Sequence, residues 1–499
     1  MIRKIKYVLL LLLTAAVYNS QAQNSQVMYH MNIPQRHFLN PALRTTNSVY
    51  IGLPVISGIN LNINNNFFNF SDVLINRGDS VISILHPDYE LGDFMKKIKD
   101  VNAIEPQVMF QLFGLGFSVG DLYVFLDINE KVDANIALPG DILRLGFLGN
   151  EQFVGDKLDL SSLRTDVMWY HEVGLGFSKD ITERLRIGVK GKMYMGMATV
   201  AVDNRSLGVT VNEDYTHVFD ADLTVNLSAP ATAYINADNM IDSVIFNDSA
   251  FEETSGIIDY FLKSGNRGLG IDIGAEYTFN ERLRASASIT DLGYIKWKRD
   301  ITNLNAESRF EFSGLDMLDV YTGDITFDSL AMEMVDSLSN SFSLDQNNSP
   351  FTTYLPFGVS LAGSFNLTKS VSVGVLSYTR FIGKQVKEAL TLSANVNLGN
   401  ALSTTLAYTA ANHRYDNLGL GLAFRGGWFQ FYFLADRIPV TWNKIIAEDL
   451  ETPFGNNGIP IPTSWNTIHF RLGMNLCFGN NVKKKNDNPM VVVKQELAE

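Results

Sequence analysis

The chain has 499 residues, 46% of them hydrophobic, and a formal net charge of −13 at pH 7. This acidic balance argues against a nucleic-acid-binding protein, which needs basic surfaces. The single cysteine, Cys477, excludes an internal disulfide and a cysteine-based metal cluster. No apolar run after the N-terminus reaches the roughly 20 residues that a membrane-crossing helix needs.

The N-terminus has the three parts of an export signal. A basic start, an apolar run and a small-x-small cleavage site follow one another, at Arg3 to Lys6, residues 7–17 and Ser20 to Ala22. We therefore expect residues 1–22 to be removed as a signal peptide and the mature chain to begin at Gln23. The next segment, 23–47, is expected to be a short periplasmic or plug segment ahead of the first strand.

After this segment, apolar residues repeatedly occupy every second position, with Gly, Ser, Thr or charged residues between them. A period of two predicts strands whose two faces meet different environments. The stretches are long enough to cross a bilayer at a tilt, whereas strands of soluble proteins average about five or six residues. The fourteen predicted strands are 48–63, 107–119, 122–137, 165–179, 184–202, 268–279, 282–298, 355–366, 369–382, 389–398, 401–411, 418–425, 428–437 and 466–478.

The connections between these strands alternate between short and long, as they do in bacterial outer-membrane barrels. The short ones are 120–121, 180–183, 280–281, 367–368, 399–400 and 426–427, and the long ones are 64–106, 138–164, 203–267, 299–354, 383–388, 412–417 and 438–465. The pattern predicts an all-β fold, an antiparallel transmembrane β-barrel of about 14 strands (12 to 16) with short periplasmic turns and long extracellular loops. We expect the barrel at 48–479 and a tail at 480–499, with both termini periplasmic in the bacterial outer membrane.

Two of the expected outer loops, 203–267 and 299–354, are strongly acidic. Residues 212–260 contain ten acids and no Lys or Arg, and residues 300–350 contain ten acids and one Arg. Such segments fit solvated loops that could contact a protein partner. They could also bind divalent cations, but no calcium-loop spacing is present.

No arrangement typical of an enzyme or a cofactor site is present. The 7 histidines do not form a metal-ligand pair, and Gly-x-Ser-x-Gly and phosphate-binding motifs are absent. His171 or His413 could serve a hydrolase at the barrel rim, but a structural role at the interface or in a loop explains them better. We therefore expect no enzyme, no cofactor and no metal site.

The inward faces of the predicted strands carry opposite charges on neighbouring strands. This set comprises Glu172, Arg184, Arg186, Lys190, Lys192, Asp272, Glu276, Arg282 and Arg284, and Arg380, Arg425 and Arg471 follow on later strands. In a wide barrel such charges can line an aqueous path, as in porins. They can also form cross-strand pairs that hold the wall, and this second interpretation is favoured because adjacent opposite charges pair in any barrel.

Two short motifs carry a resemblance to known outer-membrane barrels. Asn40-Pro41-Ala42, just before the first strand, is similar to the opening of FadL-type barrels, a family that includes the long-chain fatty-acid transporter and the PorV-like proteins of the type IX secretion apparatus. The last strand resembles the signal that the barrel assembly machinery recognises, formed here by Arg471, Gly473, Leu476 and Phe478. The cleavage region and the Glu-Arg-Leu turns resemble barrels of Bacteroidota, many in families without assigned function.

The resemblance covers the barrel and implies two alternative functions. A FadL-like barrel would pass or bind small, hydrophobic molecules while its outer face contacts outer-membrane lipids. A PorV-like scaffold would not transport, and would hold a secreted or assembly partner through its long outer loops. Segment 23–47 is shorter than the plug of the fatty-acid transporters, which argues against a ligand-gated hatch, and the tail with Lys483 to Lys485 departs from barrels that stop at a terminal aromatic residue.

Overall fold

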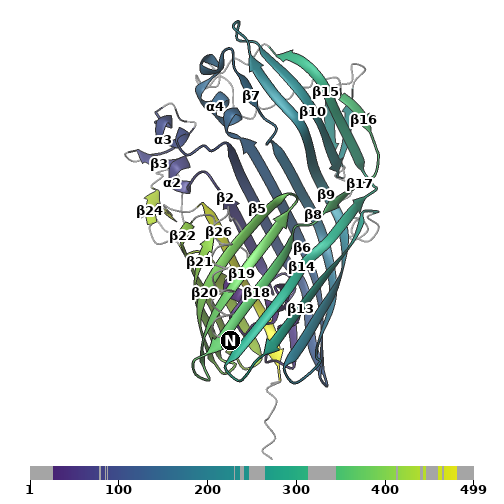
Figure 1. Cartoon of the computed structure of the whole chain (residues 1–499), viewed down its shortest axis with the longest axis vertical. Helices are drawn as coiled ribbons and strands as arrows, with labels where there is room; N and C mark the ends of the chain where they lie inside the picture. Colours follow the sequence, from purple (N-terminus) through teal and green to yellow (C-terminus); the bar gives the residue numbers. More distant parts are fainter. Residues whose placement is uncertain are drawn as a thin grey trace, which may run out of the picture.

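The computed structural model describes residues 26–77, 80–84, 86, 88–229, 231–235, 241–246, 265–312, 344–411, 414–438, 442–445, 459–462 and 466–479. The expected signal peptide, the tail, His413 and much of the two acidic stretches lie outside these residues. The described chain forms a closed antiparallel β-barrel of 14 strands with further strands above one end (Figure 1). Among the described residues, no helix is both long and apolar enough to cross a membrane.

Each strand of the wall pairs with the next one along the chain. In order they are β1 (Val49–Gly52) continued by β2 (Ile59–Asn65), β5 (Val101–Val119), β6 (Leu122–Pro139), β8 (Arg164–Asp180), β9 (Leu185–Val211), β13 (Arg267–Thr278), β14 (Leu283–Trp297), β17 (Phe351–Tyr354) continued by β18 (Phe357–Asn366), β19 (Val371–Ile382), β20 (Gln385–Leu398), β21 (Leu402–Ala411), β22 (Arg414–Gly426), β23 (Phe429–Ala435) and β26 (Thr467–Phe478). The last strand pairs with the first, Val49 opposite Phe478 and Ile59 opposite Leu472, which closes the barrel.

The fourteen strands predicted from the sequence are confirmed, as are the six short turns between them. One connection, 383–388, was expected to be long and is instead a two-residue turn between β19 and β20. Gly383 supplies the positive φ, 56°, that such a turn needs. The prediction was wrong because Lys387 and Glu388 were assigned to a loop, whereas Lys387 lies within β20 and its side chain is buried.

The acidic stretches are not loops throughout. β9 continues to Val211, and β10 (His217–Ser228), β15 (Ile301–Phe312) and β16 (Leu344–Asn347) pair in turn to extend the sheet above the barrel (top right in Figure 1). We call β10, β15, β16 and the upper part of β9 the outer sheet. Apolar side chains of the outer sheet pack against α4 (Gly140–Leu148) and β7 (Lys157–Asp159), which explains why these acidic segments fold.

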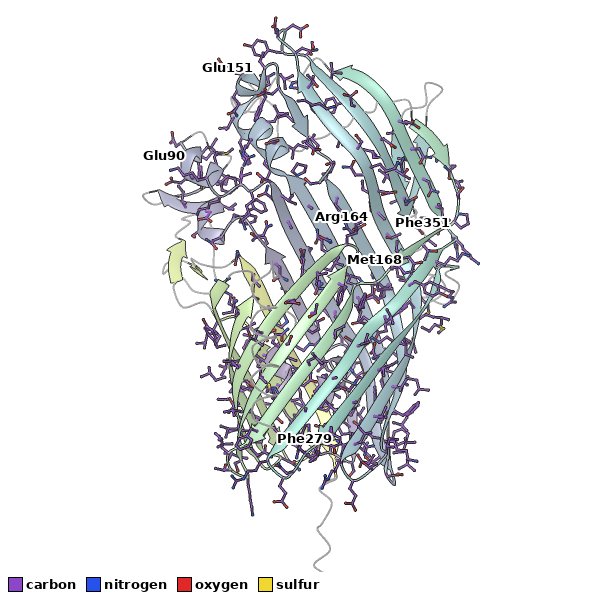
Figure 2. The ribbon with its side chains drawn as sticks, viewed as in Figure 1. Glu90, Glu151, Arg164, Met168, Phe279 and Phe351 are labelled. Atoms are coloured by element: carbon purple, nitrogen blue, oxygen red, sulfur yellow. The ribbon has the colours of Figure 1, made fainter. Side chains whose placement is uncertain are left out.

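Smaller elements lie in the other connections at this end of the barrel. They are α2 (Phe70–Val73), β3 (Leu74–Arg77), β4 (Ser80–Ser83), α3 (Leu91–Met95), η3 (Glu151–Phe153), β11 (Ala231–Ile235), β12 (Ile241–Phe246), β24 (Trp442–Ile445) and β25 (Ile459–Pro462). Phe279 lies beside the short turns and Phe351 toward the opposite end of the wall (Figure 2). The two ends are called the short-turn end and the long-loop end below.

The wall has an apolar outside and a polar inside. Leu175, Leu269 and Leu392 point outward and are 60%, 59% and 57% exposed, whereas Glu172 and Asp272 on the inner face are 1% and 0% exposed. This is the reverse of a soluble protein, and it is the arrangement that suits a barrel surrounded by lipid.

The first described segment, 26–47, does not belong to the wall. It contains two short 3-10 helices, η1 (Gln26–His30) and η2 (Pro34–Phe38), and most of its side chains are buried. We call residues 26–47 the plug, because its hydrogen-bond partners surround it.

Candidate functional site

The plug lies in the lumen and is tied to strands all around the wall. At its start, the backbone N–H groups of Gln26 and Val27 donate to the two carboxylate oxygens of Asp436, just after β23, at 3.0 and 2.9 Å. At its end, Arg44 donates to Ser178 of β8 at 2.7 Å. Between them the plug bonds to β5, β6, β13, β14, β21 and β26. A segment bonded to strands around the wall lies across the lumen at this level.

The Asn40-Pro41-Ala42 motif rests on two glycines of the wall. Gly188 of β9 and Gly274 of β13 face each other in the sheet register. A Cβ at Gly188 would overlap the backbone of Pro41, and one at Gly274 would overlap the Asn40 side chain. The Asn40 amide donates to the carbonyl oxygens of two wall residues and its own oxygen accepts from the Ala42 N–H at 2.9 Å. Here glycine is needed for close approach, and the motif anchors the plug.

Gln35 connects the plug to the break between β1 and β2. Its amide donates to the carbonyl oxygen of Ser57 at 3.1 Å and exchanges hydrogen bonds with Asn475 of β26. The Tyr432 hydroxyl donates to the same Ser57 oxygen at 2.7 Å. The break therefore exposes a backbone acceptor to the lumen, and the plug and Tyr432 both donate to it.

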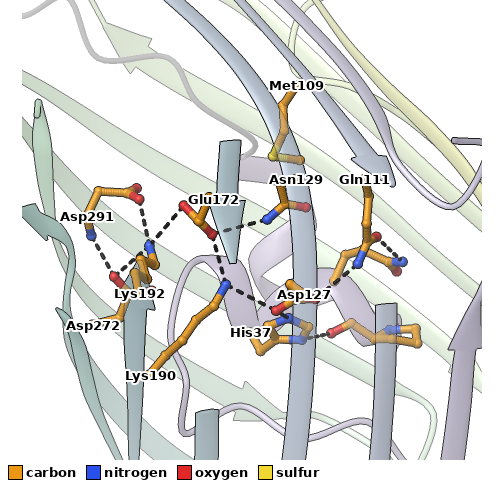
Figure 3. A network of polar contacts seen from close by, with 12 residues as sticks. His37, Met109, Gln111, Asp127, Asn129, Glu172, Lys190, Lys192, Asp272 and Asp291 are labelled. Carbon is orange, nitrogen blue, oxygen red and sulfur yellow. Dashed lines mark hydrogen bonds and ion pairs between the residues drawn. The ribbon is translucent and has the colours of Figure 1, made fainter. Parts of the chain in front are cut away.

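A buried network of charged side chains covers the wall beside the plug (Figure 3). Its centre is Lys190 of β9, which contacts Asp127 of β6 and Glu172 of β8, both at 3.1 Å, and is 0% exposed. Lys192 contacts Asp272 of β13 at 2.8 Å and Asp291 of β14 at 2.6 Å.

Further contacts connect this network into one unit. Lys131 contacts Glu172 at 2.6 Å, and the Asp291 backbone N–H donates to Asp272 at 2.7 Å. Each carboxylate named here contacts a lysine, as expected for the buried Glu172 and Asp272, whose charges must be paired to offset their desolvation. The geometry is that of a cross-strand network that holds five strands, β6 to β14, in register.

His37 joins this network to the plug. Its Nε2 lies 2.8 Å from the Asp127 carboxylate and its Nδ1 lies 2.7 Å from the Pro34 carbonyl oxygen. The ring thus contacts the wall through one nitrogen and its own segment through the other. The ring also packs against Phe125, with 4.4 Å between the ring centroids. The plug thus contributes one polar side chain to a wall network.

Two ion pairs cross the lumen between walls that are far apart in strand order. Arg380 of β19 contacts Asp133 of β6 at 2.7 Å, and Lys387 of β20 contacts Glu105 of β5. Six strand-to-strand steps separate the members of each pair around the fourteen-stranded wall. Opposed charges therefore bridge the lumen where the sequence suggested that they could line a path.

A cavity of about 90 Å³ lies between the plug and the Arg380–Asp133 bridge. Met28, Phe38 and Leu39 of the plug form one side of it. Four cations, Lys131, Lys192, Arg380 and Arg471, line the rest together with carboxylates and aromatic side chains. We call this space the chamber.

Of the nine predicted lumen charges, some form ion pairs in the structure and others do not. Glu172, Lys190, Lys192 and Asp272 join the network, and Arg186 pairs with Glu276 at 2.9 Å. Arg184, Arg282 and Arg284 are exposed at the short-turn end and make no ion pair with any described residue. At that end water competes for the charge, so the expected pairing does not form.

The network also contains members that sequence reasoning missed. Asp127 and Lys131 are separated by an even number of positions in β6 and therefore lie on the same face of the strand. The alternation that identified Lys190 could have found them. Asp291 gave no such signal, because β14 bulges there, with a φ of 62° at Asp291 and a shift of register against β13. His37 is in a segment without periodicity and gave none either.

The four residues of the expected assembly signal lie on both faces of β26. Arg471 and Gly473 point into the lumen, where a Cβ at Gly473 would overlap the Ser57 carbonyl group. Leu476 is half-buried and Phe478 is 40% exposed at the end of the strand. Across the described ranges, no group of three or more His, Cys, Asp or Glu side chains is placed to hold a metal ion.

Comparison with known proteins gives distant similarities and one family. A Pseudomonas aeruginosa FadL homologue shares 9% sequence identity over 92% of this chain and 100% of that chain, with a TM-score of 0.39. The P. putida toluene transporter TodX shares 8% over 93% of this chain and 96% of that chain, with a TM-score of 0.36. No curated protein matches the sequence. The model of the family of unknown function DUF5723 matches residues 41–436, most of the chain, and the protein therefore belongs to that family.

Proposed function

We propose that this protein is an outer-membrane barrel that passes small molecules, and that the plug and the two cross-lumen ion pairs keep it closed at rest. The observation that carries the proposal is how the lumen is closed. The closing parts are a terminal segment and paired side chains, and neither belongs to the hydrogen-bonded wall.

The wall can stay intact while these parts move. β26 pairs with β1 and β2 without help from the plug, so the barrel is closed by its own backbone hydrogen bonds. The plug is held by hydrogen bonds, by the His37–Asp127 contact and by packing of Met28, Met31 and Ile33. Buried ion pairs are a poor way to obtain stability alone, because desolvation cancels much of their attraction. Their presence across a lumen fits a gate.

The outer membrane is the proposed location, with the short-turn end facing the periplasm. The outward apolar residues would be unfavourable in water and are suited to lipid. β1 and β26 place both ends of the barrel chain beside the short turns, since Val49 and Phe478 are partners. The predicted signal peptide, the relationship to Bacteroidota barrels and recognition by the assembly machinery complete the proposal.

The molecules that pass are proposed to have both an apolar and a polar part. Met28, Phe38 and Met109 give the chamber an apolar side, which fits the hydrophobic substrate implied by the FadL resemblance. A purely apolar molecule in the chamber would displace water from the charged groups opposite them and would offer these groups no hydrogen bond. We therefore expect an amphipathic substrate.

A second candidate function, a PorV-like scaffold, is favoured by the outer sheet. This sheet rises above the barrel with an apolar core of its own, which includes Leu158, Leu207 and Val209. β16 pairs with β15 and with no other described strand, and a free strand edge is a common way to bind a peptide chain. A barrel that only holds a partner would use this surface and keep its lumen closed. Neither candidate is an enzyme.

The rate at which small solutes enter proteoliposomes that contain the barrel distinguishes the transport function from the scaffold function. The wild-type barrel is expected to admit small solutes slowly, and deletion of 26–46 is expected to speed their entry strongly. Glu105→Gln combined with Asp133→Asn, which weakens both cross-lumen bridges, is expected to give an intermediate rate. Folding is checked by the shift in gel mobility on boiling. If the folded deletion variant is as impermeable as the wild type, transport is wrong, and a stoichiometric partner in native purification would then establish the scaffold.

A further inference from the structure

We propose that the chamber binds a small monocarboxylate through the guanidinium group of Arg471. The inference deepens the proposed function by naming a ligand class, and it rests on that function only for its biological purpose. Binding itself needs only the folded barrel.

Arg471 is a buried cation without a carboxylate partner. It lies on β26 and is 4% exposed. Its hydrogen bonds go to sulfur atoms, Met28 Sδ at 3.1 Å and Met109 Sδ at 3.8 Å, and its Nε has no partner among the described residues. Thioether sulfur is a weak acceptor, so most of the hydrogen-bonding capacity of this group is unused.

The other cations of the chamber are all paired. Arg380 contacts Asp133 at 2.7 Å, Lys131 contacts Glu172 at 2.6 Å, and Lys192 contacts Asp291 at 2.6 Å. Arginine is almost never fully buried unless it is paired, because an isolated charge loses its hydration. Arg471 departs from this rule inside a chamber where the rule otherwise holds, which points to a partner from outside the chain.

The surroundings of Arg471 hold the group in place for such a partner. The Phe38 ring of the plug lies 5.4 Å from the guanidinium carbon, a cation–π contact. Asn60 of β2 is directly opposite Arg471 in the sheet register and also lines the chamber. Its side-chain oxygen is buried and has no partner among the described residues. The unused Arg471 donor suits an anion, whereas the Asn60 oxygen is an acceptor and would not itself bind one.

The chamber selects the class of ligand by size and charge. Its volume of about 90 Å³ is small, which favours a short carboxylate over a long chain. A planar carboxylate matches the fork of the guanidinium group. Asp133, Glu172 and Asp291 line the same space and disfavour a doubly charged anion such as phosphate. Met28 and Met109 can contact a short apolar body.

The site lies where an incoming molecule would meet the plug. Met28 and Phe38, both in the plug, contact Arg471 directly. A carboxylate on Arg471 would therefore lie against the plug, on its long-loop side, below the Arg380–Asp133 bridge.

Calorimetric titration of the detergent-solubilised, full mature chain with sodium propionate tests the proposal. The wild type is expected to bind propionate. Arg471→Gln is expected to weaken binding by about tenfold or more, because a charge-assisted pair is lost. Asn60→Asp places a carboxylate opposite Arg471, so this folded variant should lose propionate binding to a similar extent. Arg282→Gln, which removes the same charge from an exposed arginine at the short-turn end, should leave the affinity unchanged.

Several results would overturn the inference. They are an absence of propionate binding by the folded wild type, undiminished binding by Asn60→Asp, or binding of inorganic phosphate in preference to propionate. Because Arg471→Gln can also impair barrel assembly, Asn60→Asp is the decisive variant. Binding that depends on Arg471 in a barrel that admits no solute would contradict the proposed function and leave this inference standing.

Discussion

β9 runs through both parts of the molecule and meets a different environment in each. In the barrel its apolar residues Ile187 and Met193 face outward and are 36% and 43% exposed, and its charged residue Lys190 is 0% exposed inside. In the outer sheet its apolar residues Leu207 and Val209 are covered by α4 and β7 and are 8% and 0% exposed. β9 therefore exposes its apolar residues in the barrel, as a membrane protein does, and buries them in the outer sheet, as a soluble protein does.

The difference teaches where each part obtains its stability. The barrel interior is held by paired charges and by the hydrogen bonds and apolar packing of the plug, whereas the outer sheet is held mainly by apolar side chains packed on one another. Loss of a charged side chain should therefore destabilise the barrel interior more than the outer sheet. The predictions below use this contrast, in order of decreasing effect.

The largest effect is expected for Lys190→Met. Removing this lysine leaves Asp127 and Glu172 short of a buried partner, and breaking a buried ion pair costs about 3–5 kcal/mol. The measurement is urea-induced unfolding of the barrel in lipid vesicles. Lys157→Met is the matched control, because Lys157 pairs with Asp220 on the exposed outer sheet and should cost about 1 kcal/mol or less. Equal losses in the two variants would contradict the contrast.

Leu207→Ala tests the apolar core of the outer sheet. Truncation of a buried leucine costs about 2–5 kcal/mol, and here the loss should fall on the outer sheet while the barrel keeps its heat-modifiable gel mobility. Rapid proteolysis above the barrel is the expected result. Met193→Ala on the same strand faces lipid, so proteolysis of that variant should match the wild type.

Gly188→Leu tests whether the wall makes room for the plug. Its side chain would overlap Pro41, and overpacking costs typically about 1–3 kcal/mol, which should displace the plug and speed solute entry. Gly191→Leu is the control, since Gly191 is on the same strand and a Cβ there meets nothing within 4 Å. If both variants admit solutes at the wild-type rate, the plug does not rest on Gly188.

The smallest effect concerns an exposed pair of the outer sheet. The hydrogen bond from Arg205 lowers the pKa of Asp222, so its contribution to stability is present above the ordinary value of 3.8 and is lost as pH falls through the lowered pKa. Arg205→Gln should raise the midpoint of the Asp222 carboxyl titration, followed by NMR, without changing barrel stability. An unchanged midpoint would show that the pair does not persist in solution.

The wall could be predicted from the sequence because the two faces of each strand meet different environments, and the residues therefore alternate. Lipid on one face and the lumen on the other impose alternation over every strand, so the fourteen strands could be located. The rule failed where a charge lies inside a strand, as at Lys387, and where apolar protein covers an acidic strand, as in β10.

The site was less predictable because its contacts are between distant residues. Gln35 and Asn475 are 440 residues apart, and Arg380 and Asp133 are 247 apart. Nothing in the sequence relates such partners. The motif at Asn40 was recognised by resemblance alone, and its physical role depends on Gly188 and Gly274, whose small size has meaning only once the plug lies on them.

The most direct test of the account is the accessibility of the plug in the folded barrel. Cys477 is fully buried and is replaced by serine, and a cysteine is then introduced at Ala42, which is 0% exposed in the plug, or at Lys369, which is exposed in a short turn. A water-soluble maleimide should label Lys369→Cys at once and Ala42→Cys only after the barrel is unfolded. Equally fast labelling of both cysteines in the folded protein would show that residues 26–47 do not close the lumen.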